Sequence, residues 1–459
     1  MLFSSIPFLY YFLPTVLILY FLAPRGWRNA LLLTASLVFY GWGEPKYLLL
    51  MAGAILAFYL FGIAVGRVQG KGRRVLLTAA VLTGVLLLGV FKYADFFIAS
   101  FSGITGLSLP LLRLALPIGI SFYLFQCVSY VVDVYRGQAA PQKSIVKFGA
   151  YVAMFPQLIA GPIVRYVDVA PQLDSRETSW EDFCLGLRRF LIGLGKKVLL
   201  ANQFGQLTTY FRDCGEPSTL FYWLYALGFT LQIYFDFSGY SDMAIGLGRI
   251  LGFRFLENFN YPYRSKSVTE FWRRWHISLG SWFRDYVYIP LGGSRVSRGR
   301  WVRNILAVWM LTGLWHGSAW NFVLWGLIFA VLLMVEKWLP GIQKAPAWLR
   351  CGYVLLAVTL SFVVFNGESM EQIAADFAGL FGFAGLPAVN TVTLYYLRSF
   401  ALLFLAGILG ATELPKRLWE RLPEGFRAPA EPVLLIALLL LCTAYLVDGS
   451  FNPFLYFRF

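Results

Sequence analysis

Residues 47–65 read YLLLMAGAILAFYLFGIAV, a run without a single charged side chain. A helix needs about 20 consecutive apolar residues to cross the hydrocarbon core of a bilayer. The run therefore predicts a transmembrane helix. Runs of the same kind recur along the rest of the chain, which predicts that the protein folds within a lipid bilayer.

The composition extends this prediction to the whole chain. Only 14% of the residues are charged, against about 25% in soluble domains. The mean hydropathy is +0.64, far above that of a protein that must cover its core with polar surface. The runs are long and do not alternate, which favours helices over an outer-membrane barrel. We predict an all-α polytopic membrane protein.

The apolar runs predict about eleven crossings of the bilayer. They cover residues 6–22, 29–43, 47–65, 75–91, 114–132, 183–203, 220–250, 305–315, 319–335, 353–365, 394–411 and 433–447. Several runs are short, and others are interrupted by Pro110, Pro117, Pro156 and Pro162. Broken backbone is tolerated at membrane depth only where protein buries it, so re-entrant and interfacial helices are expected as well.

The distribution of basic residues predicts the orientation. Lys and Arg cluster in loops after the first, third and fifth runs, and such loops face the cytoplasm. Residues 254–303 are also rich in Arg and are predicted to form an interfacial segment on the cytoplasmic side, whereas 367–390 lack Lys and Arg and are expected outside. Both termini are then predicted outside.

The net charge of +15 does not indicate nucleic-acid binding, because the basic residues lie in these short loops. The five cysteines have irregular spacing, which predicts neither a disulfide framework nor a metal site. Residues 1–21 lack a basic start and a small-residue cleavage site, so no cleavable leader is expected. We predict one membrane domain over residues 1–459.

Two histidines occur in the chain, and His316 is the stronger candidate for chemistry. It lies in LWHGSAWNF, residues 314–322, within an otherwise apolar stretch. An ionisable group at membrane depth is costly and tends to mark function. Spacing of four residues places Thr312, His316 and Trp320 on one helix face. A packed structural histidine is the alternative.

The second histidine, His276, lies in the basic segment FWRRWHISL, residues 271–279. Arg273, Arg274 and Trp275 precede it, and Arg284 follows within SWFRDY. Arginine is suited to binding phosphate groups, so these residues are candidates for the wall of a donor site. The alternative is an interfacial helix in which the histidine is incidental.

A third polar island is YFDFSGYSDM, residues 234–243. Its carboxylates, Asp236 and Asp242, interrupt a long apolar run together with Ser238. A carboxylate at the centre of a membrane helix costs about 2.5–3.5 kcal/mol, so each is expected to be paired, with the arginines near His276 as possible partners. Packing by buried ion pairs is favoured here over catalysis. A fourth island, FPQLIAGPIVR at 155–165, is read as the wall of a cavity.

Together these islands resemble the MBOAT family of membrane-bound O-acyltransferases, and in particular its bacterial branch that O-acetylates alginate and other surface polysaccharides. The resemblance spans nearly the whole chain. It is carried by LFSS at 2–5, FQ at 125–126, SY at 129–130, DVYR at 133–136, FPQLIAGPI at 155–163, YFDFSGYSDMAIG at 234–246, FWRRWHISLGSWFRDYVYIPLGG at 271–293, LWHGSAWNFVLWG at 314–326 and NPFLYFRF at 452–459.

The resemblance implies a ring of transmembrane helices around a central funnel, in the inner membrane of a bacterium. It implies that His316 is the catalytic histidine and that His276 is a second signature histidine near the donor. The donor would be acetyl-CoA or an acyl carrier protein thioester from the cytoplasm, with no permanently bound cofactor. The acyl group would pass to a periplasmic partner of the SGNH-hydrolase type, which modifies the polysaccharide.

The expected chemistry is general base catalysis, in which His316 takes the proton of an acceptor hydroxyl as that oxygen attacks the thioester. Trp320 or Asn321 is a candidate for stabilising the oxyanion, with Trp315 as a supporting wall. A transient acyl-histidine is a second route. The remaining alternatives are a membrane transporter and a non-catalytic scaffold of a polysaccharide export complex.

Overall fold

Helices make up the regular structure of the protein in a computed structural model that describes residues 1–449 and 454–455. No strand occurs in these ranges, so the all-α prediction is confirmed. The chain divides into two compact units, one formed by Met1–Phe190 with Ser241–Leu256 and the other by Leu191–Tyr240 with the chain from Glu257 onward. The prediction of one membrane domain stays a prediction.

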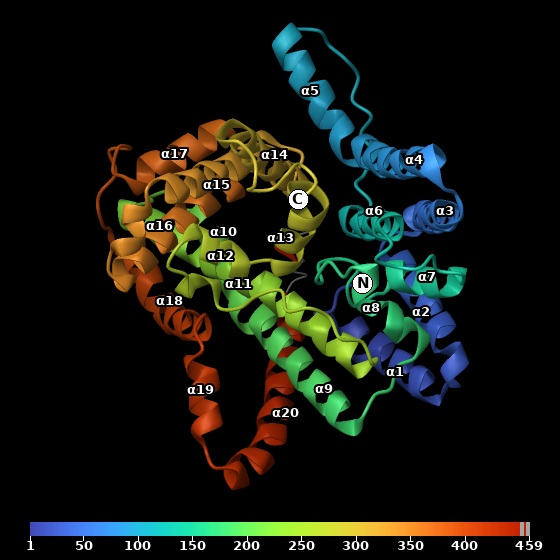
Figure 1. Cartoon of the computed structure of the whole chain (residues 1–459). Coiled ribbons are helices and arrows are strands. Elements are labelled where there is room, and N and C mark those ends of the chain that lie inside the picture. Colours follow the sequence, from blue (N-terminus) through green and yellow to red (C-terminus); the bar gives the residue numbers. More distant parts are fainter. Residues whose placement is uncertain (450–453, 456–459) are drawn as a thin grey trace. The chain divides into compact units, whose positions relative to one another are not determined.

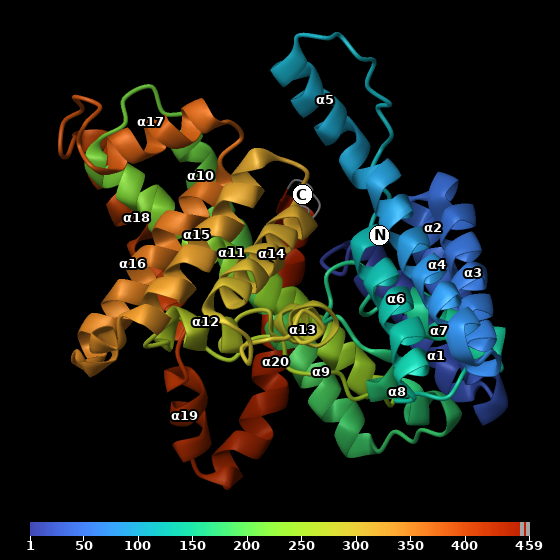
Figure 2. The same cartoon turned by 45° about the horizontal axis from the view of Figure 1, so that its top comes forward.

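The first unit holds the N-terminal helices, in which α3, α4 and α6 pack together and α2 packs on α7 (Figure 1). Figure 2 shows α5 extending away from α4. The helices of the first unit are α1 (Leu13–Leu22), α2 (Arg28–Gly43), α3 (Leu48–Arg67), α4 (Gly70–Leu88), α5 (Ala94–Thr105), α6 (Ile120–Arg136), α7 (Ile145–Ala153) and α8 (Tyr166–Asp174), with most of α9 (Trp180–Gly195) and the end of α11 (Thr219–Ile250).

Short segments of other helical types join or extend these helices in both units. Within the described part of the chain, four are π-helical and four are 3-10 turns, and each of these 3-10 turns contains or directly follows a proline. They are η1 (Pro7–Phe12), η2 (Arg25–Trp27), η3 (Pro45–Tyr47), η4 (Gly89–Tyr93), η5 (Lys196–Ala201), η6 (Pro262–Arg264), η7 (Arg284–Tyr288) and η8 (Pro340–Lys344).

The broken backbone that the prolines predict is present and buried. Residues 154–165 between α7 and α8 are not helical, and nearly all of them are buried. Gly119, at φ +73°, passes so close that a Cβ atom would lie 2.7 Å from the carbonyl oxygen of Leu158. The run predicted from residue 114 therefore becomes helical only at Ile120, after Pro117 and this glycine. The predicted role of residues 155–165 as a cavity wall stays a prediction.

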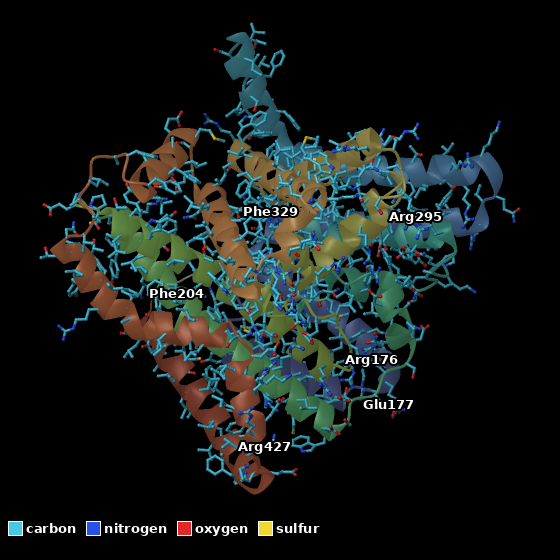
Figure 3. All side chains as sticks on the ribbon, turned by 60° about the vertical axis from the view of Figure 1, so that its left-hand side comes forward. Arg176, Glu177, Phe204, Arg295, Phe329 and Arg427 are labelled. Carbon is cyan, nitrogen blue, oxygen red and sulfur yellow. The ribbon has the colours of Figure 1, made fainter. Side chains whose placement is uncertain are left out.

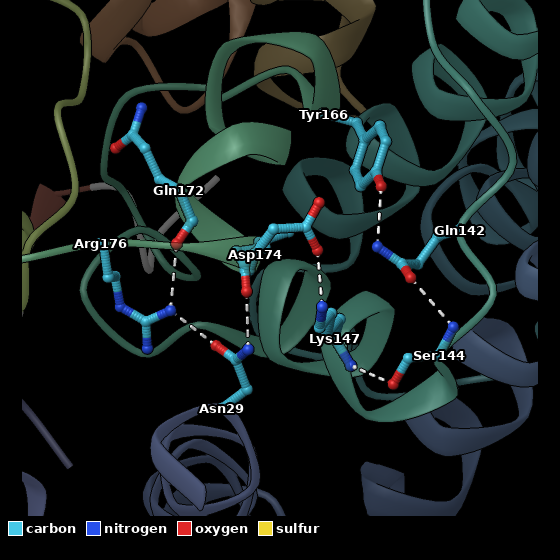
Figure 4. Close-up of polar contacts among 9 residues, drawn as sticks. Asn29, Gln142, Ser144, Lys147, Tyr166, Gln172, Asp174 and Arg176 are labelled. Carbon is cyan, nitrogen blue, oxygen red and sulfur yellow. Dashed lines mark hydrogen bonds and ion pairs between the residues drawn. The ribbon is translucent and has the colours of Figure 1, made fainter. Parts of the chain in front are cut away.

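Polar side chains join the ends of α2, α7 and α8 (Figure 4). The guanidinium of Arg176 donates to the side-chain oxygen of Asn29 at 2.7 Å and to the carbonyl oxygen of Gln172 at 3.1 Å. Lys147 pairs with Asp174 at 2.6 Å. The contact to Gln172 gives a partner to a backbone carbonyl in the last turn of α8, and the other two join side chains of neighbouring helix ends.

The second unit contains both histidines. Its helices are α10 (Asn202–Arg212), most of α11, α12 (Val268–Arg274), α13 (Ile277–Phe283), α14 (Arg298–His316), α15 (Trp320–Trp338), α16 (Ala347–Asn366), α17 (Met370–Leu380), α18 (Thr391–Gly410), α19 (Leu414–Arg421) and α20 (Glu424–Asp448). Phe204 of α10 and Phe329 of α15 both lie in its buried aromatic core (Figure 3).

Helices α14 and α15 form a tightly packed hairpin. A Cβ atom at Gly326 would lie 2.2 Å from the carbonyl oxygen of Trp309, and one at Gly313 would lie 2.3 Å from that of Phe322. Small residues that let two backbones approach are a common device in membrane helix packing. The hairpin fixes the end of α14, where His316 lies.

Six helical stretches in the described residues are long and apolar enough to cross a membrane, so the chain is a multi-pass membrane protein. They are Pro45–Arg67, Gly70–Thr105, Trp320–Trp338, Ala347–Asn366, Thr391–Gly410 and Glu424–Asp448. The expected count of about eleven stays a prediction, as do the orientation of the chain and the outside location of its termini. Most of the predicted C-terminal motif, 452–459, lies outside the described residues.

Candidate active site

His316 is the last residue of α14, and its side chain is buried with 5% of its surface exposed. Gly317 is extended, so the helix stops directly after the histidine. The imidazole ring lies in an aromatic box, with ring centres 5.0 Å from Trp315, 5.0 Å from Trp325 and 5.4 Å from Phe365. The predicted histidine is therefore held in a rigid and largely apolar pocket.

The expectation that Trp320 shares a helix face with His316 is wrong. The helix breaks at residues 317–319, and Trp320 begins the next helix, α15. Its side chain is 55% exposed, whereas Thr312 is buried one turn before the histidine. The i, i+4 argument holds only within one continuous helix, and the Gly-Ser pair after His316 ends it.

Asn321 is buried near the break and makes a structural contact. Its side-chain amide donates to the carbonyl oxygen of Phe365 at 3.0 Å. That carbonyl belongs to the last turn of α16, where helix carbonyls lack partners within the helix. The contact ties α15 to α16 beside His316, and the role of Asn321 toward an oxyanion stays a prediction.

His276 lies between α12 and α13 in a left-handed conformation, with φ 44° and ψ 53°. Its Nδ1 lies 3.2 Å from the side-chain oxygen of Asn258, and its ring centre lies 4.6 Å from that of Phe237. The Nε2 atom is buried and has no hydrogen-bond partner among the described residues. Burial, and secondarily the nearby His316, hold the pKa of His276 well below its usual value.

The two histidines lie together although 39 residues separate them in sequence, with ring centres 6.5 Å apart. Trp315 lies beside both rings, 5.6 Å from His276 and 5.0 Å from His316. The structure thus brings the two signature motifs into one pocket. Imidazole is the side chain that most often transfers protons in catalysis, so the pair is a candidate for proton transfer.

The short helix α12, which leads to His276, is fixed by α15. The carboxylate of Glu336, which is buried, accepts hydrogen bonds from the backbone N–H groups of Val268 and Thr269 and from the Thr269 hydroxyl. Ser267 caps the same helix by accepting from the N–H of Glu270 at 2.9 Å. A carboxylate at a helix N-terminus is electrostatically favourable. No local pattern in the sequence distinguishes Glu336, because its partner helix is distant in the chain.

A cavity of about 780 Å³ is lined by residues close in sequence to both histidines, although neither His276 nor His316 is part of its lining. Its walls are mainly aromatic and aliphatic, and they include Thr312, one turn before His316, and Ile277, next to His276. The apolar lining includes Trp272, Phe283, Trp301, Ile305, Trp309 and Leu333, and the basic lining is Arg273, Arg284 and Lys337. A smaller recess of about 300 Å³ shares Arg273 with the cavity and adds Lys266 and Arg350.

The four candidate donor-site residues separate into two groups. Arg273 and Arg284 are exposed and line the cavity, and Arg284 also pairs with Asp285 at 2.7 Å. Arg274 instead pairs with Glu270 at 2.8 Å, and Trp275 is buried with its ring centre 5.3 Å from that of Phe362. Lys337, Lys266 and Arg350 are further basic residues at these cavities, and no sequence motif links them to His276 because they lie on or beside other helices.

The expected pairing of the acidic island with the arginines near His276 is wrong. Asp236 pairs with the buried Lys197 and also accepts from the backbone N–H of Leu455 at 2.9 Å. Asp242 lies in the first unit and pairs with Arg189 at 2.9 Å. Ser238 is buried on the same helix. Of residues 234–243, Phe237 contacts His276, whereas the two carboxylates form ion pairs with neighbouring helices, as the packing interpretation predicts.

Comparisons with known proteins agree with these motifs. A family model described as MBOAT, membrane-bound O-acyltransferase family, matches residues 38–358. The probable alginate O-acetylase AlgI of Azotobacter vinelandii is 39% identical, with 100% of both chains covered. The protein of the same name from Pseudomonas aeruginosa is 43% identical over 83% of this chain and 75% of its own. The peptidoglycan O-acetyltransferase of Helicobacter pylori is 33% identical over 84% of this chain and 81% of its own.

Proposed function

The chain belongs to the membrane-bound O-acyltransferase family, and from this premise we propose that it takes an acetyl group from a cytoplasmic thioester and passes it on for O-acetylation of an exported polysaccharide. It is an acyltransferase and a multi-pass membrane protein. The observation that carries the finer proposal is the meeting of His276 and His316 next to residues, Ile277 and Thr312, that line a cavity with basic side chains.

The cavity suits the donor that we propose. Acetyl-CoA and an acyl carrier protein present the acyl group on the same slender phosphopantetheine arm. The aromatic walls of the cavity fit such an arm, while Arg273, Arg284 and Lys337 offer positive charge to its phosphate. The arginine fork suits phosphate oxygens in particular.

In the proposed reaction, His316 acts as a general base. The acceptor hydroxyl gives its proton to the imidazole while its oxygen forms a bond to the thioester carbonyl carbon. The carbon–sulfur bond then breaks, and the thiolate takes the proton back, which leaves an ester and a free thiol. Proton transfer of this kind contributes about 10²–10⁴ in rate.

The acceptor side of the proposal rests on the relatives. Two of the relatives are named probable alginate O-acetylase and peptidoglycan O-acetyltransferase. We propose that this chain lies in the inner membrane of a bacterium and serves a polysaccharide such as alginate, with an exported SGNH-hydrolase-like protein as the immediate acceptor. The basic loops support a cytoplasmic donor side.

The test is thioester cleavage by the purified protein in lipid vesicles with labelled acetyl-CoA, with and without an exported SGNH-type acceptor protein. We expect turnover by the wild-type protein and a fall of at least about 100-fold in His316→Gln, because this variant lacks the general base. Trp348→Ala is the matched control, since this tryptophan of α16 is 71% exposed and does not line the cavity. Full turnover in His316→Gln would remove the catalytic role, and absence of thioester cleavage in the wild type would favour a transporter or a scaffold.

A further inference from the structure

The hydrogen bonds around Asn258 determine which of its side-chain atoms is the oxygen. The backbone N–H of Ser278 points to this atom at 3.2 Å, and the Ser278 hydroxyl lies 2.9 Å from it. A backbone N–H can only donate, so the atom that it meets must be an acceptor. Oδ1 of Asn258, and not its amide nitrogen, therefore faces this cluster.

The same oxygen determines the tautomer of His276. Nδ1 lies 3.2 Å from Oδ1, and an oxygen that only accepts requires a proton on that nitrogen. The Ser278 hydroxyl is 3.5 Å from Nδ1, but its single proton is directed to the closer Oδ1. A neutral imidazole carries one proton, so Nε2 must hold a lone pair.

The backbone at His276 shows that this arrangement is held against strain. His276, Tyr261 and Arg113 are the described non-glycine residues with positive φ. Such conformations cost about 1–3 kcal/mol and persist where the surroundings determine them. Here the N–H of Ile277 also donates to the carbonyl oxygen of Asn258 at 3.0 Å, so one residue holds both the backbone and the ring.

We propose that Asn258 is a positioning residue, which holds His276 as the Nδ1–H tautomer so that its Nε2 lone pair accepts a hydrogen bond in the pocket shared with His316. The chemistry that fits this atom is a hydroxyl donor, such as that of the acyl acceptor. Nε2 cannot polarise a thioester carbonyl, because that role requires a donor. The assignment of the tautomer does not depend on the proposed function, whereas the role of Nε2 toward an acyl acceptor rests on that function.

The groups around His276 also make the role of Asn258 testable through the pH dependence of the reaction. His316 on α14 is the titratable side chain of the described residues that acts on His276 through its charge. The helix α11 presents Phe237, and the segment before α12 presents Asn258. A carboxylate at position 258 would keep the acceptor and add a negative charge, which favours the protonated imidazole.

The first test is nitrogen NMR of protein in lipid vesicles with ¹⁵N-labelled histidine. His316→Asn leaves His276 as the one histidine of the chain, so its two nitrogens are assigned without ambiguity. We expect the proton at Nδ1 in this variant and at least partial transfer to Nε2 when Asn258→Leu is added. Asn260→Leu is the matched control, because this residue is exposed two positions away. A proton at Nε2 in the single variant, or no change with Asn258→Leu, would overturn the proposal.

The second test measures thioester cleavage of labelled acetyl-CoA against pH. We expect Asn258→Leu to lose about 10- to 100-fold in kcat/KM, a part of the contribution of a general base. Asn258→Asp should retain activity and move the acid limb of the profile up by about one pH unit, with Asn260→Asp unchanged. An acid limb that stays in place in Asn258→Asp would remove the functional role. Absence of wild-type turnover would count against the proposed donor alone, since the NMR result is independent of it.

Discussion

The buried imidazole of His276 makes the stability of the protein depend on pH. Because burial lowers its pKa in the folded state, the unfolded chain binds the proton more readily below about pH 6.5. The stabilisation is therefore fully present above that pH and is lost as the pH falls. Each further pH unit costs at most about 1.4 kcal/mol of the free energy of unfolding.

We expect the thermal unfolding midpoint of the detergent-solubilised protein to fall between pH 6.5 and 5.5, and to fall less in His276→Asn. Asparagine tolerates the left-handed backbone at this position and does not titrate, so the variant isolates the imidazole. An equal pH slope in both proteins would show that other groups carry the dependence.

The basic rim of the cavity predicts a binding effect at a single residue. Arg273→Ala should raise KM for acetyl-CoA by about 3- to 10-fold with kcat little changed, as expected for a contact made equally in the ground and transition states. The effect should shrink in high salt, since the side chain is exposed. Arg300→Ala is the control, because this exposed arginine does not line the cavity. A loss confined to kcat would contradict the assignment.

At the scale of helices, the α14–α15 hairpin is the element that places His316. Gly326→Ala would bring a Cβ atom to 2.2 Å from the carbonyl oxygen of Trp309, so the helices must separate. We expect a loss of about 1–3 kcal/mol in stability, typical of overpacking, with reduced turnover. Gly299→Ala lies on α14 with open space around it, and it should be neutral or stabilising by about 1 kcal/mol. Equal stability of the two variants would show that the close approach is unimportant.

The sequence predicted the helices better than it predicted the breaks between them. The apolar runs at 47–65 and 319–335 correspond closely to α3 and α15, since hydropathy directly reports a helix in lipid. The break after His316 was harder to predict, because a Gly-Ser pair is also compatible with a continuing membrane helix. Because the break was not predicted, Trp320 was placed on the same helix face as His316, whereas it lies at the exposed start of α15.

At the scale of the whole molecule, what the sequence did not predict is the set of contacts between distant segments. The pairing of Asp236 with Lys197, and the contact of Asn258 with His276, join segments that no periodicity relates. Composition shows that a buried charge needs a partner but not which one it has. The two histidines were identifiable because they are scarce in an apolar chain, whereas Asn258 is one polar residue among many.

For the whole molecule we predict the orientation of the chain in the membrane, with the basic loops on the cytoplasmic side as the positive-inside rule requires. In a variant whose five cysteines are replaced, Lys71→Cys lies in the basic first turn of α4 and Ala384→Cys in the segment without Lys or Arg, and both positions are exposed. We expect a membrane-impermeant maleimide to label Ala384→Cys in intact cells, and Lys71→Cys only after the membrane is opened. Both should be labelled equally in detergent, which controls for reactivity. The reverse pattern would place Arg273 and the cavity rim on the outer side, away from a cytoplasmic thioester, because the same rule assigns 254–303 to the side of Lys71.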